Sequence, residues 1–128
     1  MEVHLWCIVA AWVWVYAGKL PMAFAMQKSG GYDNHHPRAQ EAALTGWGAR
    51  AVAAHLNGFE TFAPFAVAVL VAHLAGGSTP VVDALAVTFV ASRLVYVGCY
   101  LADLASLRSA VWMVGWLVTL GLFLTPVL

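Results

Sequence analysis

Four long apolar blocks separated by short polar stretches constrain this chain more than any other feature of its sequence. Each block is close to the roughly 20 residues that an α-helix needs to cross a hydrocarbon core about 30 Å thick. Hydrophobic residues make up 62% of the chain and charged residues only 9%, which excludes an ordinary soluble domain. We therefore expect an all-α integral membrane protein whose single domain, residues 1–128, is an up-down bundle of four transmembrane helices.

The first apolar block has two features that bear on its assignment as a span. Pro21 lacks an amide hydrogen, so it should kink or end the helix late in the block. A secretory signal is the alternative, but only Glu2 precedes the block, with no basic residue, and no small-residue cleavage site follows it. We therefore expect a true span. The four expected spans cover about residues 3–26, 48–75, 81–101 and 108–126.

Three connections join these spans. The long polar segment 27–47 contains a turn at Gly30-Gly31, and 38–44 is expected to form a short helical lead-in to the second span. The run from Gly76 to Pro80 predicts a tight hairpin, and 102–107 predicts a second short turn.

Basic residues gather beside the first and third connections. Lys28, Arg38 and Arg108 lie there, whereas the second connection has no lysine or arginine and the amino terminus offers only Glu2. Because basic residues favour the cytoplasmic side of a membrane, we expect the 27–47 segment in the cytoplasm and both termini outside.

The second span carries charged and amide side chains on one helical face. Asn57 and Glu60 follow Arg50 at spacings of 7 and 10 residues, which places all three on the same side at 3.6 residues per turn. An unpaired carboxylate or guanidinium at membrane depth costs several kcal/mol. This face must therefore line an interior site rather than contact lipid.

The third span has a matching polar face. Tyr96, Tyr100 and Asp103 follow Arg93 at spacings of 3, 7 and 10 residues. At 1.5 Å per residue, Arg93 and Glu60 lie roughly 20 and 24 Å from the outer ends of their spans. The two polar faces should therefore converge in the cytoplasmic half of the bundle.

Simpler structural roles are open for several of these residues. Glu60 and Arg93 could form an ion pair that only holds two helices together in lipid. Tyr96 and Tyr100 could be ordinary amphipathic residues near the interface. His35 and His36 are adjacent but lack a third ligand at a recognisable spacing, so we expect no metal site. The remaining candidates are expected to have structural roles: His55 packed or hydrogen-bonded, Cys7 and Cys99 in the packing, and Asp83 and Asp103 solvated or capping.

The charges of the two polar faces indicate an anionic, polar ligand. Arginine binds carboxylates through a planar fork, a glutamate suits an ammonium group, and asparagine and tyrosine can hold amides. Glutathione carries all of these groups and a thiol, although a small anionic peptide or a nucleotide sugar would satisfy the charges equally. A lipophilic second substrate would reach the site from the bilayer. The formal net charge of zero gives no argument for a nucleic-acid partner.

Two motifs resemble those of a known family. Arg50, His55, Asn57 and Glu60, followed by Pro64-Phe65, resemble the Arg-x4-[His/Gln]-x-Asn-x2-Glu signature of MAPEG proteins, the membrane-associated proteins of eicosanoid and glutathione metabolism. Arg93, Tyr96 and Tyr100 are similar to the family's Arg-x2-Tyr-x3-Tyr pattern, and Arg108 follows just beyond. The resemblance covers the whole four-span layout, and the loop from Gly31 to Arg38 looks most like that of bacterial members.

The resemblance implies a homotrimer in a bacterial inner membrane, with periplasmic termini and glutathione as co-substrate at each subunit interface, facing the cytoplasm. By matching positions, the glutathione-binding residues would be Arg50, Asn57, Glu60, Arg93, Tyr96 and Tyr100, and Arg108 would stabilise the thiolate. The activity implied is that of a glutathione transferase or peroxidase acting on a lipophilic substrate. The chain departs from better-known members at Ala49, Ala53 and Thr61, and Arg108 lies one residue further from Tyr100 than in the leukotriene-forming members.

Two other functions are open. A non-catalytic scaffold that presents membrane lipid occurs in the same family and would not form a thiolate. A small four-span multidrug transporter would also place a glutamate inside the membrane. Arg50 and Arg93 argue against the transporter, because a site for lipophilic cations should not hold arginines beside its carboxylate.

Overall fold

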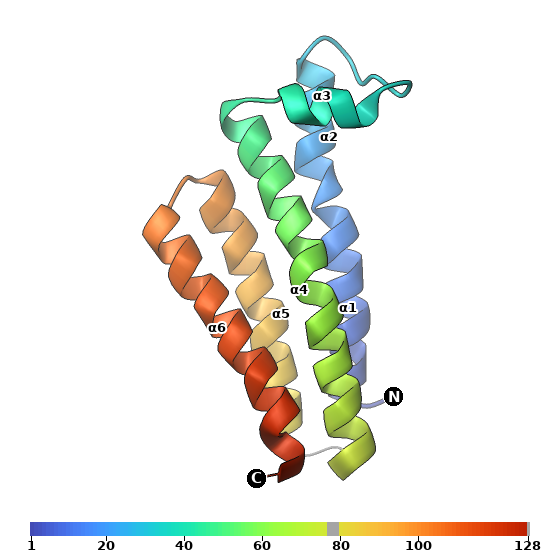
Figure 1. Cartoon of the computed structure of the whole chain (residues 1–128), viewed down its shortest axis with the longest axis vertical. Coiled ribbons are helices and arrows are strands. Elements are labelled where there is room, and N and C mark those ends of the chain that lie inside the picture. The colour runs from blue at the N-terminus through green and yellow to red at the C-terminus, as the bar shows by residue number, and fades with distance from the viewer. Residues whose placement is uncertain (77–79, 128) are drawn as a thin grey trace.

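The computed structural model describes residues 1–76 and 80–127, and these residues form helices joined by short connections (Figure 1). The elements are α1 (Val3–Ala17), α2 (Lys19–Lys28), α3 (Pro37–Ala43), α4 (Gly46–Gly76), α5 (Pro80–Leu101), α6 (Ala105–Leu124) and the 3₁₀ turn η1 (Thr125–Val127). Four segments are long and apolar enough to cross a membrane: 3–28, 46–76, 80–101 and 105–127. The four-span, all-α membrane fold is therefore confirmed. The predicted hairpin falls largely on residues 77–79, which lie outside the described residues.

The first span is interrupted at Gly18, between α1 and α2. Pro21 has no amide to offer the carbonyl of Ala17, four residues earlier, and its ring crowds that carbonyl. The chain nevertheless continues as a helix to Lys28, so the effect of Pro21 is an interruption within the span and not its end. Nearby, the ring nitrogen Nδ1 of His55 hydrogen-bonds the carbonyl oxygen of Val15 at 3.0 Å. His55 is thus a buried, hydrogen-bonded residue, as expected.

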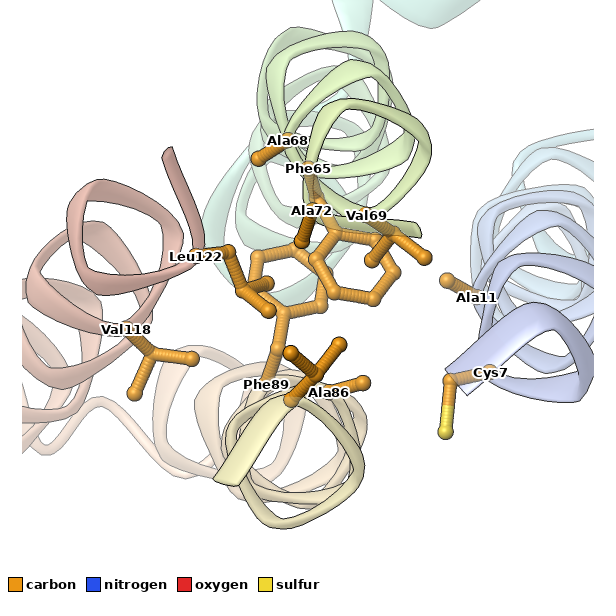
Figure 2. Close-up of a cluster of buried hydrophobic side chains, with 11 residues drawn as sticks. Cys7, Ala11, Phe65, Ala68, Val69, Ala72, Ala86, Phe89, Val118 and Leu122 are labelled. Atoms are coloured by element: carbon orange, nitrogen blue, oxygen red, sulfur yellow. The ribbon is translucent and has the colours of Figure 1, made fainter. Parts of the chain in front are cut away.

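The buried core is formed jointly by α1, α4, α5 and α6 (Figure 2). Phe65 of α4 and Phe89 of α5 stack in it, with ring centroids 3.8 Å apart and planes 5° apart. The side chains around them are small or branched: Cys7, Ala11, Ala68, Val69, Ala72, Val82, Ala86, Val118 and Leu122. Small residues let helices approach closely, which drives helix association in lipid, where burial from water contributes little. Cys7 and Cys99 are both free and buried, as expected for packing residues.

The segment between α2 and α4 folds across one end of the bundle, and both termini lie at the other end (Figure 1). Gly30 and Gly31 have φ values of +94° and +95°, which confirms the predicted turn, because such angles favour glycine. The short helix α3 corresponds to the predicted lead-in. Its Glu41 lies 3.1 Å from Arg38 of the same helix and 3.7 Å from Lys19, and the pair with Lys19 joins α3 to α2.

The connection between α5 and α6 is shorter than the predicted turn at 102–107, because α6 begins at Ala105. Asp103 has φ 59°, and the amides of Asp103 and Leu104 donate to the carbonyls of Tyr100 and Cys99 at 3.2 and 2.9 Å. These are the hydrogen bonds of a Schellman motif, with aspartate in the left-handed position that glycine usually takes. Asp103 therefore caps α5, one of the two roles expected for it, and does not continue the helical face predicted from its spacing. Arg108 lies inside α6 and not at its start.

Candidate functional site

A polar group joins α4 and α5 at mid-depth in the bundle. Nη1 of Arg93 donates to Oδ1 of Asn57 at 3.4 Å, and Nδ2 of Asn57 donates to Oε2 of Glu60 at 3.0 Å. Arg93 is only 6% exposed, whereas Glu60 lies on the surface of the single chain. The structure thus brings together three of the residues predicted to form the site, one from α5 and two from α4.

An ion pair between Glu60 and an arginine is not among the contacts of the described residues, so the single chain does not form the Glu60–Arg93 pair considered from the sequence. Asn57 stands between the two charges because it precedes Glu60 by three residues on α4, close enough to reach its carboxylate. Its amide offers a donor to Glu60 and an acceptor to Arg93. The carboxylate and the guanidinium therefore remain available to a third partner.

Two tyrosine rings lie between Arg93 and Arg108, in a row that runs towards the α3 end of the bundle. Cζ of Arg93 lies 4.1 Å from the ring centroid of Tyr96, and Cζ of Arg108 lies 4.4 Å from that of Tyr100. The two tyrosine rings meet edge to face, with centroids 5.6 Å apart. A guanidinium over an aromatic face is attracted by the negative charge of the ring surface. The predicted face of α5 is therefore a continuous surface, and it includes Arg108 from α6.

Arg50 lies apart from this group. Its Nη2 donates to the carbonyl oxygen of Leu101 at 3.4 Å, and its Nη1 lies 4.0 Å from Oδ2 of Asp103. A cation at the carboxyl end of α5 is favoured by the helix dipole. Asn57 is seven residues further along α4, a rise of roughly 10 Å. The structure therefore places Arg50 at the mouth of the site and not beside Asn57 and Glu60.

Two guanidinium nitrogens are buried without a hydrogen-bond partner among the described residues: Nη2 of Arg93 and Nε of Arg50. Buried donors in native proteins nearly always have a partner. Leaving one unpaired costs about 1–3 kcal/mol, and more when the group is charged. Both arginines consequently have the capacity to bind an acceptor that the single chain does not supply.

A cavity of about 290 Å³ lies beside the polar group, between α4, α5 and α6. Asn57 and Glu60 form its polar part. Its other walls are largely apolar: Thr61, Pro64, Phe89, Trp112, Gly115, Trp116, Thr119, Leu120 and Phe123. The α6 part of this lining was not predicted, although Trp112, Trp116 and Thr119 recur at spacings of four and three residues, the signal of one helical face. The site thus combines charged groups with an apolar chamber.

These features define a class of protein: a four-span integral membrane protein with a polar interhelical group beside a largely apolar cavity. A sequence model described as the MAPEG family matches residues 3–128, so the chain belongs to the MAPEG family. This family includes glutathione transferases and related proteins. The resemblance seen in the second and third spans is thereby confirmed. A comparison with curated proteins and one with solved structures each found no match.

Proposed function

We propose that this protein binds glutathione at Arg93, Asn57 and Glu60 and directs its thiolate at a lipophilic substrate in the adjoining cavity. The observation that carries the proposal is the buried Nη2 of Arg93, which has no acceptor among the described residues and belongs to a guanidinium 3.4 Å from Asn57. The arginine suits a glutathione carboxylate, Glu60 suits the ammonium group, and the Asn57 amide suits a peptide group.

The remaining predicted residues have distinct roles in this proposal. Tyr96 and Tyr100 line the path from Arg93 to Arg108, and their hydroxyl groups can hold the peptide part of glutathione. Arg50, at the mouth, attracts the second carboxylate. Arg108 favours the charged form of the sulfur, because a nearby cation stabilises a thiolate, the nucleophilic form of the thiol.

The apolar cavity suits the second substrate. Its tryptophan-rich α6 wall favours an apolar molecule that enters from the bilayer, whereas glutathione would arrive from water. In a transfer reaction the thiol proton is released to solvent and the sulfur forms a bond to an electrophilic carbon. That carbon either loses a leaving group with its bonding electron pair, or gives up the electron pair of a double bond, which then takes a proton from solvent. In a peroxidase reaction the thiolate would attack the hydroperoxide and break its O–O bond, giving a sulfenic acid and, after protonation, an alcohol. A second glutathione thiol would then displace water from the sulfenic acid and form glutathione disulfide.

We infer that the site is completed by neighbouring copies of the chain in a homotrimer. Glu60 is exposed in the single chain yet lies near the middle of α4, Gly46–Gly76, at membrane depth. An ionised carboxylate facing lipid there would cost several kcal/mol, so a second subunit is expected to cover it. Native mass spectrometry of the protein released from detergent should give three chains per particle; a monomer would contradict this inference.

We also propose that the α3 end faces the cytoplasm of a bacterial inner membrane and that both termini face the periplasm. Lys19, Lys28, Arg38, Arg50 and Arg108 lie towards that end, and the charged residues at the other end are Glu2 and Asp83. Single cysteines replacing Ser29 and Gly76, in a chain with Cys7 and Cys99 changed to alanine, test the orientation. An impermeant thiol reagent added to intact cells should label position 76 and not position 29, and the reverse pattern would contradict the orientation.

The direct test of the activity is the ultraviolet difference spectrum of the purified protein with saturating glutathione. We expect a thiolate band, together with conjugation of a lipophilic electrophile. The cavity also favours a second function, a lipid-binding scaffold, because an apolar chamber can hold an acyl chain without chemistry. Binding of a fatty acid with neither a thiolate band nor conjugation would reject the enzyme and support the scaffold.

A further inference from the structure

A second polar cluster lies at the end of the bundle opposite α3, where α1 begins, α4 ends and α5 begins (Figure 1). Its side chains are Glu2, His4, His73 and Asp83, and they come from three different helix ends. His4 is completely buried, whereas Glu2 and His73 are 47% and 33% exposed. The cluster is thus built around a buried imidazole and remains open to solvent on one side.

Three ligand atoms in this cluster form a small triangle. Nε2 of His4 lies 3.1 Å from Nδ1 of His73 and 3.3 Å from Oε2 of Glu2, and Nδ1 of His73 lies 3.4 Å from the same oxygen. A tetrahedral Zn²⁺ ion with bonds of about 2.0–2.1 Å holds its ligand atoms roughly 3.3–3.4 Å apart. The triangle therefore has nearly the dimensions of one face of a zinc coordination tetrahedron.

Asp83 orients the buried imidazole for such a role. Its Oδ1 lies 2.7 Å from Nδ1 of His4 and accepts the backbone amide of His4 at 3.1 Å. An ionised carboxylate can only accept hydrogen bonds, so the proton of the neutral imidazole lies on Nδ1 and the lone pair on Nε2. This is the carboxylate–histidine arrangement that fixes the tautomer of metal-binding histidines.

The electrostatics of the cluster call for a cation. The Nε2 lone pair of His4 and the Glu2 carboxylate are both acceptors, and they lie 3.3 Å apart. With both imidazoles neutral, Nδ1 of His73 can donate one hydrogen to one of these acceptors, which leaves the other acceptor facing a lone pair. A divalent ion at the centre of the triangle would satisfy all three atoms together.

We propose that Glu2, His4 and His73 bind a divalent transition-metal ion, Zn²⁺ foremost, with Asp83 as the hydrogen-bond partner of His4. Two imidazoles and a carboxylate suit Zn²⁺ and its neighbours in the first transition row and not the hard ions Ca²⁺ or Mg²⁺. The fourth position faces solvent beside Glu2 and His73 and is open to water. This proposal departs from the expectation of no metal site and is independent of the glutathione site.

The test uses the full-length protein in detergent, purified through a tag without histidine and stripped of metal. Calorimetric titration with ZnCl₂ should show one tight site per chain, and Co²⁺ should give the visible absorption of a tetrahedral complex. Glu2→Gln and His73→Gln should each weaken Zn²⁺ binding at least tenfold. Asp83→Asn should weaken it by about 10- to 100-fold, the range for partners of metal-bound histidines.

The matched control is a His35→Gln, His36→Gln double variant, which removes two histidines from the opposite end of the molecule without touching the cluster. It should bind Zn²⁺ as the unaltered protein does. Glu2 and His73 are partly exposed, so their variants should fold, and helical circular dichroism checks that they do. Equal Zn²⁺ binding by the unaltered protein and by the folded Glu2→Gln and His73→Gln variants would overturn the proposal. Loss of binding only in the His35→Gln, His36→Gln double variant would overturn it as well. In either case the cluster would be held by hydrogen bonds alone.

Discussion

The two polar clusters of this bundle differ in the hydrogen-bonding groups that they offer. In the Arg93 group, Asn57 separates the guanidinium from Glu60, and a buried nitrogen of the arginine has no acceptor among the described residues. In the His4 group, the two ring nitrogens of His4 lie 3.3 and 2.7 Å from the carboxylates of Glu2 and Asp83. The first cluster therefore offers a buried cationic donor to a ligand, and the second offers carboxylate and imidazole acceptors.

This difference shows how the charge of a ligand can be inferred from the hydrogen-bonding groups that a protein leaves unpaired. Helix packing in lipid requires polar side chains to be satisfied, because no water is available in the hydrocarbon core. A group left with surplus donors or surplus acceptors is therefore informative about its partner. The two proposals, glutathione at one cluster and a metal ion at the other, make separable predictions.

The largest effect should follow from Arg93→Gln. Losing one partner of a buried charged pair costs about 3–5 kcal/mol, so glutathione affinity should fall by roughly 150-fold or more. Zn²⁺ affinity should not change, because the metal cluster lies where α4 ends and α5 begins, away from Arg93. Calorimetry with both ligands measures this, with Arg38→Gln on the exposed surface of α3 as the control. Unchanged glutathione binding would show that Arg93 serves only to pack α5.

An intermediate effect is expected for Glu60→Gln. Hydrogen bonds to charged groups contribute about 1.5–3 kcal/mol, so glutathione binding should weaken by roughly 10- to 150-fold. The trimer should persist, since glutamine can still accept a hydrogen bond from Asn57. Glutathione titration and native mass spectrometry measure the two quantities on one sample. A variant that loses the trimer but retains residual binding would instead assign Glu60 a purely structural role.

The smallest effects should distinguish binding from chemistry at the two outer arginines. Arg50→Ala should chiefly raise KM for glutathione, because anchoring a carboxylate contributes equally to the ground and transition states. Arg108→Ala should reduce the thiolate band and kcat with binding nearly intact; a loss of about 1.4 kcal/mol would be a tenfold change. Arg108→Lys should restore part of the activity, since a point charge still stabilises sulfur.

Steady-state kinetics and the thiolate spectrum of the three variants provide the measurements. If Arg108→Ala leaves the thiolate band and the conjugation rate unchanged, Arg108 only anchors the fourth span. The residue that activates sulfur would then have to be Arg93, Tyr96 or Tyr100.

Much of the fold could be predicted from the sequence because helix spacing and apolar length are local properties. The four spans, the lead-in before α4 and the face of Arg93, Tyr96 and Tyr100 follow from periodicity alone. The predicted turn at 102–107 begins where α5 ends but extends too far, because the left-handed Asp103 reverses the chain within a few residues and α6 already begins at Ala105.

The parts of the sites that could not be predicted depend on contacts between distant segments. The link through Asn57 requires the relative rotation of α4 and α5, which spacing on one helix does not define. Glu2, His4, His73 and Asp83 come together only when three helix ends meet, so no spacing in the sequence marks them. Charged and imidazole side chains near span ends are usually solvated, so a solvated or capping role was expected for Asp83 and the cluster was not predicted.

The most direct test of the central claim is an electron cryomicroscopy structure of the detergent-solubilised protein with saturating glutathione. A carboxylate of glutathione should lie within hydrogen-bond distance of Nη2 of Arg93, with Glu60 facing the ammonium group and the sulfur directed towards Arg108. If Nη2 of Arg93 instead pairs with a side chain of a neighbouring subunit while glutathione is absent or bound elsewhere, the arginine belongs to a structural contact and the proposed site is wrong.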